Sequence, residues 1–195
     1  MSVFDNLMDL QRQINTQQTL LNQILRVDRP SVSPVKVVAV EYAEFTGTQS
    51  ASVAGGGNVA ITNLSITHAM ANAGNKLLLI GSVGLIASSL QYIGAGIAIA
   101  KDGALITTGA AVGNRTPIGA GILANYSAAV DYSSSSIVGI YEHLPASTAA
   151  KTYTVRAINL SGSIRTIYIN RTETDANLVF VPRSMSSFCI IEVGA

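Results

Sequence analysis

Residues 77–100, LLLIGSVGLIASSLQYIGAGIAIA, decide the fold, because 24 positions without a charge are long enough to cross a bilayer as one helix. Four glycines and the polar SSLQ in the middle weaken a helix over this stretch. Its second half alternates with a period of two residues and runs into Asp102-Gly103, a strong hairpin signal. The stretch therefore predicts two or three buried strands, and a membrane-spanning helix is the alternative.

The rest of the chain from Lys36 onward has the same strand-like character. Short apolar or alternating runs are separated by turn signals, which are GGG at 55–57, NAGN at 72–75 and SGS at 161–163. This spacing predicts eight to ten short strands in an antiparallel β-sandwich over 36–195 and no helix after Val27. Runs such as KLLLIGSV are apolar on both faces, which is expected where a neighbouring subunit covers the outer face.

The first 29 residues have a different period. With Leu7 at heptad position a, the a and d positions are apolar except for one glutamine: Val3, Leu7, Leu10, Ile14, Gln17, Leu21 and Ile24. A 3.5-residue period predicts a coiled coil, and β-branched residues at d favour more than two strands. The buried amide of Gln17 is expected to fix register and oligomer number. The alternative is an amphipathic helix that packs on its own domain.

Two prolines divide this helix from the β-rich part. Pro30 and Pro34 end the helix and begin an extended spacer that carries the chain away. The predicted organisation is a coiled-coil stalk at 1–29, a spacer at 30–35 and a β-sandwich knob at 36–195.

Composition limits the classes of function. A net charge of +1 gives no footprint for nucleic acid, and 48% apolar content with only 12% charged residues indicates that subunits share a core. The single cysteine, Cys189, lies in a strand-like run and is interpreted as a buried, inert thiol. Asp5 and Asp9 stand where a signal peptide would be basic and apolar, so no signal peptide is predicted.

Catalytic and metal-binding patterns are not found in the sequence. The two histidines, His68 and His143, form no zinc motif, and His68 is interpreted as a structural histidine in an alternating strand. A serine triad built from Ser133–Ser136, His143 and Asp131 would lack a GxSxG elbow. The acids of the body are scattered, so we predict no enzyme and no cofactor, with a polysaccharide-cleaving spike as the alternative.

Surface recognition is expected in the irregular stretch 109–133, because binding residues concentrate on loops held by a rigid scaffold. Aromatic rings stack on sugars, and Asn, Asp and Arg bind hydroxyl groups. The candidate surface-binding residues are Asn114, Arg115, Asn125, Tyr126, Asp131 and Tyr132. The alternative makes them ordinary loop or interface residues. A second cluster, Arg171, Glu173, Asp175 and Arg183, is interpreted as a solvated edge.

Several segments between 60 and 195 carry a resemblance. These are ITNLSITHAMANAGNKLLLIGSVG, IAIAKDGALI, VGIYEHLPASTAAKTYTVRAINLSGSIRTIYINR and the terminal PRSMSSFCIIEVGA. Together with the predicted coil and spacer, they resemble the fibre and knob proteins of tailed bacteriophages. The resemblance implies a homotrimeric, jelly-roll-like knob on a virion and no cofactor. One short helix in place of a long shaft implies a short spike or a capsid decoration rather than a long fibre.

The expected function is that of a virion appendage, a trimeric short tail fibre or spike whose knob adheres to the host cell surface. The alternative is a capsid (head) fibre, decoration or baseplate protein that binds other virion proteins. The expected partners are two further copies of the chain, virion proteins at the N-terminal anchor and a host polysaccharide or protein receptor, without nucleic acid or a membrane span. The expected location is the virion, assembled in the host cytoplasm.

Overall fold

The computed structural model describes residues 36–88, 94–122, 135–177, 179 and 181–195. The predicted coil at 1–29 and the spacer at 30–35 lie outside the described residues and stay predictions. Within the described part every regular element is a strand and none is a helix, which confirms the mainly β prediction. The strands are β1 (Val37–Phe45), β2 (Gln49–Val53), β3 (Asn58–His68), β4 (Lys76–Ser88), β5 (Ala95–Lys101), β6 (Ala104–Leu105), β7 (Ala120–Ile122), β8 (Ser135–His143), β9 (Lys151–Asn159), β10 (Arg165–Ile169) and β11 (Ser186–Val193).

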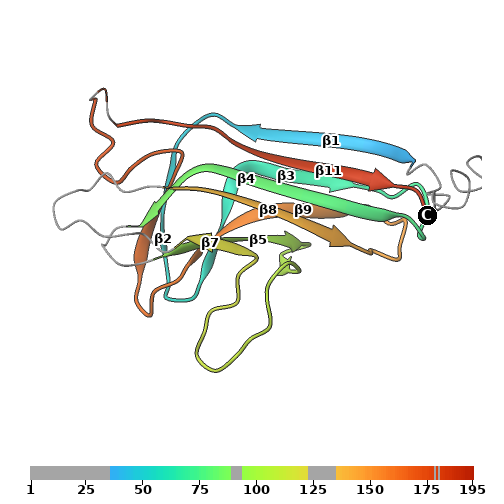
Figure 1. Cartoon of the computed structure of the whole chain (residues 1–195), viewed down its shortest axis with the longest axis horizontal. Helices are drawn as coiled ribbons and strands as arrows, with labels where there is room; N and C mark the ends of the chain where they lie inside the picture. The colour runs from blue at the N-terminus through green and yellow to red at the C-terminus, as the bar shows by residue number, and fades with distance from the viewer. Residues whose placement is uncertain (1–35, 89–93, 123–134, 178, 180) are drawn as a thin grey trace, which may run out of the picture. The chain divides into compact units, whose positions relative to one another are not determined.

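The strands form two antiparallel sheets (Figure 1). Sheet A has the order β1-β11-β4-β10-β2, and β8 pairs with β4. Sheet B has the order β3-β9-β5-β6, and β7 pairs with β5. Buried residues of both sheets join one hydrophobic core, and β1 and β11 contact β3 across it. The predicted antiparallel sandwich is therefore present. The described part has eleven strands where eight to ten were predicted, because it includes β6 and β7, which are only two and three residues long.

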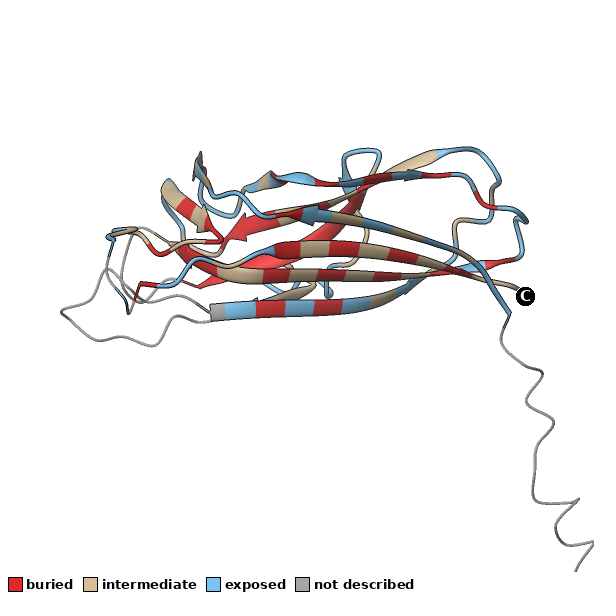
Figure 2. Cartoon of the chain, turned by 90° about the horizontal axis from the view of Figure 1, so that it is seen from above, coloured by how far each residue is buried: buried red, intermediate tan, exposed pale blue. Residues whose placement is uncertain are grey.

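β4 shows why this sequence makes a sandwich. Its side chains alternate between buried and partly exposed, and Leu77, Leu79 and Val83 are fully buried at the inner face. Figure 2 shows this alternation as bands along several strands. The intervening Leu78 and Ile80 point to the outer face and stay partly exposed. Both faces of the folded strand β4 are therefore apolar, as the run KLLLIGSV predicted.

The stretch 77–100 folds as β4 and β5, with 89–93 outside the described residues. The hairpin predicted at its end is present, because Asp102 and Gly103 have φ angles of 48° and 88°, as a two-residue β-turn of the primed type requires. Within the described ranges there is no helix of the length and apolarity that a bilayer crossing needs. The strand interpretation is confirmed for 77–88 and 95–100.

Two buried asparagines donate hydrogen bonds to backbone carbonyl groups at the ends of strands. The amide nitrogen of Asn170 donates to the carbonyl oxygens of Phe45 (2.7 Å) and Gly47 (2.9 Å), where β1 gives way to β2. The amide nitrogen of Asn159 donates to the carbonyl oxygen of Val53 (2.9 Å) at the end of β2. Both side chains are fully buried, so these bonds satisfy backbone groups that water cannot reach.

Candidate functional site

The outer face of sheet A carries one row of apolar side chains across four strands. Tyr42 on β1 pairs in register with Cys189 on β11, which pairs with Ile80 on β4, which pairs with Ile140 on β8. Tyr42 and Ile140 are 59% and 63% exposed at the two ends of the row. A row without any charged or amide side chain is unusual on a face that a single copy leaves open to water.

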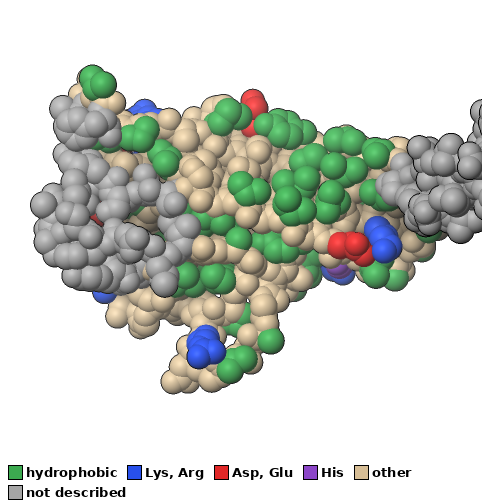
Figure 3. All heavy atoms as spheres, in the orientation of Figure 1, with side chains coloured by type: hydrophobic (Ala, Val, Ile, Leu, Met, Phe, Trp, Pro, Cys, Tyr) green, Lys and Arg blue, Asp and Glu red, His purple; other side chains and the backbone are tan. Residues whose placement is uncertain are grey.

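One of the two neighbouring rows extends the same surface. In the next row Val40, Ile191 and Leu78 lie beside one another, and Glu142 on β8 ends that row. On the other side the row runs through Glu44, Ser187 and Ser82 and is polar except for Val138, which is 56% exposed at the edge of the sheet. We call this surface the apolar face, and Figure 3 shows hydrophobic side chains gathered over β1, β11, β4 and β8. It comprises Val40, Tyr42, Leu78, Ile80, Val138, Ile140, Cys189 and Ile191.

Charged side chains lie only at the rim of this surface. Glu44 stands on β1 one outward position beyond Tyr42, and Lys76 begins β4. The Lys76 amine lies 3.0 Å from the Glu142 carboxylate, and both side chains are more than half exposed. Such a solvated pair contributes little to stability. The centre of the apolar face therefore has no charged group to favour contact with water.

The outer face of sheet B has the opposite chemistry. The hydroxyl groups of Ser65 and Thr154 lie 2.9 Å apart across β3 and β9, and those of Thr67 and Thr152 lie 2.8 Å apart. These are directly opposed cross-strand pairs. Hydroxyl pairs of this kind stabilise a sheet and stay compatible with water. The β3 and β9 part of sheet B is therefore suited to face solvent by itself.

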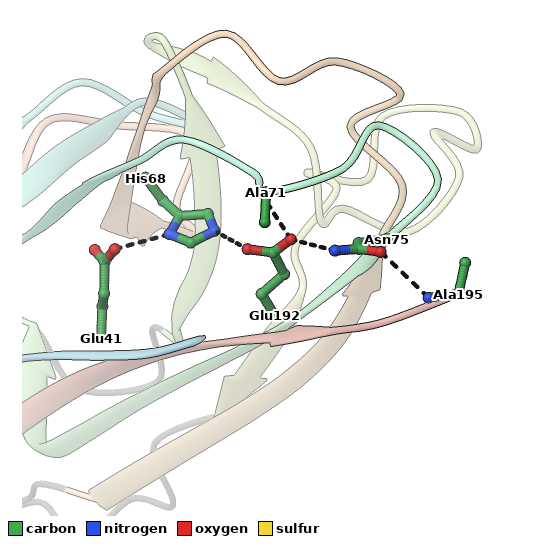
Figure 4. A network of polar contacts seen from close by, with 6 residues as sticks. All are labelled: Glu41, His68, Ala71, Asn75, Glu192 and Ala195. Atoms are coloured by element: carbon green, nitrogen blue, oxygen red, sulfur yellow. Dashed lines mark hydrogen bonds and ion pairs between the residues drawn. The ribbon is translucent and has the colours of Figure 1, made fainter. Parts of the chain in front are cut away.

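A buried network of polar side chains joins the two sheets at one end of the sandwich (Figure 4). His68 at the end of β3 forms hydrogen bonds through Nδ1 with Glu41 Oε1 (2.8 Å) and through Nε2 with Glu192 Oε2 (3.1 Å). The arrangement is a buried imidazole held between the carboxyl groups of Glu41 on β1 and Glu192 on β11.

Further hydrogen bonds fix Glu192 in this network. Its other oxygen accepts from the backbone N–H of Ala71 (3.0 Å) and from the Asn75 amide. Burial alone would raise the pKa of Glu192, but the hydrogen bonds from Asn75, Ala71 and His68 outweigh it and hold that pKa below its usual value. The Asn75 oxygen in turn accepts from the N–H of Ala195 (3.2 Å). We call these side chains the His68 network.

This network corrects one interpretation of the sequence and confirms another. His68 is a satisfied structural histidine, as expected, and is 4% exposed. The acids of the body are not all scattered, because Glu41 and Glu192 converge on it. The signal was present in the strand alternation, which places both acids among the inward positions of apolar strands. It could not be used without the pairing of the strands.

The predicted surface-binding residues are placed only in part. Asn114 and Arg115 are exposed in the segment between β6 and β7, which extends away from the two sheets in Figure 1. The segment is closed by a hydrogen bond from the N–H of Gly109 to the carbonyl oxygen of Ile118 (3.0 Å). The other four candidates, Asn125, Tyr126, Asp131 and Tyr132, lie outside the described residues.

The charged cluster after β10 is tied by ion pairs. Arg183 binds Asp175 through two nitrogens, at 3.0 Å and 2.7 Å, and Arg171 lies 3.7 Å from the same carboxylate. The hydrogen bonds from Arg183, with the charge of Arg171, lower the pKa of Asp175. The Arg171 guanidinium also lies over the Tyr168 ring at 5.2 Å. The arginines are therefore engaged within the chain, and the cluster is less solvated than the edge expected from the sequence, because Asp175 is only 14% exposed.

The other groups with reactive side chains, His143 and Cys189, lie in surroundings that shift their pKa values. Burial, with the charge of Lys101, lowers the pKa of His143, whose ring lies edge-on to Tyr153 at 5.8 Å. Burial raises the pKa of the Cys189 thiol, which makes it a weak nucleophile. Across the described ranges no three His, Cys, Asp or Glu side chains are grouped as a metal site would need. The serine triad considered from sequence has Asp131 and Ser133 outside these ranges.

Comparisons with known proteins give a distant likeness to solved structures. No protein-family model matches this chain, and no curated protein matches it either. Among solved structures, a chain in the structure of infectious bursal disease virus, Gx strain, aligns with a TM-score of 0.36 and 13% identity. The alignment covers 81% of this chain and 41% of the viral one.

Proposed function

We propose that this chain is a virion appendage protein, a homotrimeric short tail fibre or spike whose jelly-roll-like knob adheres to the host cell surface. The observation that carries the proposal is the apolar face, which lies on an antiparallel sandwich whose other outer face is hydroxyl-rich. A sandwich built to act alone would expose polar side chains on both faces. The heptad pattern of 1–29 supplies the means to hold three copies together.

Host contact falls to loops in this proposal, because the sheets supply rigidity and the loops supply adaptable polar groups. Asn114 and Arg115 are exposed on the segment between β6 and β7 and offer hydrogen-bond donors for sugar hydroxyls or a protein surface. Three weak sites on one trimer strengthen binding through effective concentration. Adhesion of this kind needs no catalytic residue and no cofactor.

The first test is the solution mass of the full chain by light scattering. A homotrimer has three times 20.3 kDa, about 61 kDa. A mass of 20.3 kDa would overturn the fibre proposal, since the heptad pattern would then have no partner helix.

The second test addresses adhesion. Fluorescently labelled full chain is added to a panel of live bacteria before and after periodate oxidation of their surface sugars. Adhesion predicts saturable binding to some strains, and a fall of at least about fivefold for a variant with Asn114→Ala and Arg115→Ala. A matched control changes Ser65→Ala and Thr67→Ala on sheet B. A trimer that binds no strain but assembles onto phage heads or tails would replace adhesion by the capsid or baseplate role.

A further inference from the structure

Nothing in the described chain covers the apolar face, whereas the inner face of the same sheet is packed in the hydrophobic core. Sheets with apolar side chains on both faces occur where both faces are covered. Val40, Tyr42 and Ile140 are each more than half exposed, so a single copy leaves much of this surface in water. The surface spans the four strands β1, β11, β4 and β8.

The chemistry of the face favours a protein over a sugar as its occupant. Recognition of a sugar needs hydrogen-bond donors and acceptors for its hydroxyl groups. Among the side chains of the apolar face only Tyr42 and Cys189 carry a polar atom, and the thiol is a weak donor. Charged groups stand only at the rim, where Lys76 and Glu142 already pair with each other. The occupant must present an apolar protein surface of its own.

The position of β1 favours a second copy of this chain as that occupant. β1 forms one edge of the apolar face and begins at Val37, immediately after Lys36. The six-residue spacer 30–35 spans at most about 20 Å, even when fully extended. On the proposed function, on which this step rests, a coil at 1–29 holds the starts of three β1 strands within that reach of one axis. The surfaces held closest together are then copies of the same face.

We propose that the apolar face of sheet A is the contact surface between copies of this chain, so that the knobs share a second hydrophobic core outside the sandwich. Cys189 lies within this contact, between Tyr42 and Ile80 in register. It is also the chain's single cysteine, so its reaction with a thiol reagent reports the coverage of the face directly.

The test measures the rate at which N-ethylmaleimide modifies Cys189 in the folded full chain, with the urea-unfolded chain as the reference rate. The face variant carries Val40→Gln and Ile140→Gln, which add no charge near the thiol but leave amides without partners in a covered face. The control carries Ser65→Gln and Thr67→Gln on sheet B. Wild type and control are expected to react at least about tenfold more slowly than the face variant. Circular dichroism and thermal melting confirm that each variant is folded.

Should the double variant fail to fold, Val40→Gln alone serves, because Val40 is 59% exposed on an edge strand and supports no core contact. Light scattering on the same samples separates the two proposals. A trimer whose Cys189 reacts equally fast in wild type and face variant overturns this inference and leaves the fibre proposal standing. An oligomer of another number with Cys189 protected supports the shared face and overturns the trimer. A monomer overturns both.

Discussion

The outer faces of the two sheets are built from residues of similar strand propensity and have opposite relations to water. On sheet B, Thr67 and Thr152 pair their hydroxyl groups across β3 and β9. On sheet A the corresponding outward positions include Val138 and Ile140. Threonine, valine and isoleucine are all β-branched and all favour strands. The difference shows that strand propensity builds a sheet, while the polarity of its outward side chains decides what covers it.

The largest expected effect comes from removing the link between the two sheets. His68→Leu leaves the buried carboxyl group of Glu192 without its imidazole partner, and we expect a loss of about 3 kcal/mol in the free energy of unfolding. Most of the loss comes from Glu192, because the Glu41 side chain is 40% exposed and keeps some hydration. Urea unfolding followed by circular dichroism measures it. His143→Leu, at a half-buried position, is the control, and an equal loss in both variants would contradict the linking role of His68.

The next prediction concerns two buried asparagines. The hydrogen bonds of one stay within sheet A, and those of the other join sheet B to sheet A. Asn170 bonds the break between β1 and β2, whereas Asn159 on β9 of sheet B bonds the end of β2. Asn170→Ala and Asn159→Ala each leave buried carbonyl groups unpaired, and we expect losses of about 2 kcal/mol. Asn72→Ala, in an exposed turn, should cost far less. Denaturation midpoints at constant m-value provide the comparison, and an Asn72→Ala loss as large as the other two would contradict it.

Acid should weaken the link between the sheets. Because the pKa of Glu192 is lower in the folded chain than its ordinary value, the folded state binds fewer protons than the unfolded state. The stabilisation is present above the ordinary pKa of about 4.3 and is lost as the pH falls through the lower folded value. Unfolding curves between pH 6 and pH 3 measure it. Glu192→Gln should have a lower but flatter profile, and parallel profiles would show that other carboxyl groups cause the effect.

The smallest effects come from exchanging the chemistry of the two outer faces. Thr67→Val with Thr152→Val removes one hydroxyl pair from sheet B, and Ile140→Thr adds a hydroxyl to sheet A. Each change should alter the free energy of unfolding by less than about 1 kcal/mol. Binding of an apolar dye should rise for the first variant. Dye binding that does not respond to the sheet B change would show that outward polarity has little influence on the surface.

The sequence predicted the sandwich because its signals are local. The alternation of β3, the continuous apolar run of β4 and the Asp102-Gly103 turn can each be recognised within a few residues. The strands β6 and β7 are too short for any period to be seen. Apolar residues on both faces of β4 also predicted a covered outer surface before any pairing was known.

The site could not be predicted in the same way, because it depends on the register between distant strands. His68 lies 27 residues from Glu41 and 124 from Glu192, and no local pattern relates them. The row from Tyr42 to Ile140 likewise needs three strand pairings to be aligned. The loop candidates were chosen by residue type alone. Only Asn114 and Arg115 fall within the described residues, so their grouping with the others stays a prediction.

One hydrogen bond joins the two ends of residues 36–195, and it has a consequence for engineering. The N–H of Gly194 donates to the carbonyl oxygen of Lys36 (2.8 Å), which places the last residues of the chain beside the entry to β1. A short linker from Ala195 to Lys36 would therefore close the sandwich into a ring. New termini could then be opened in the exposed segment that carries Asn114 and Arg115. Such a circular permutant would display any fused peptide on that loop and keep the strand pairings of both sheets.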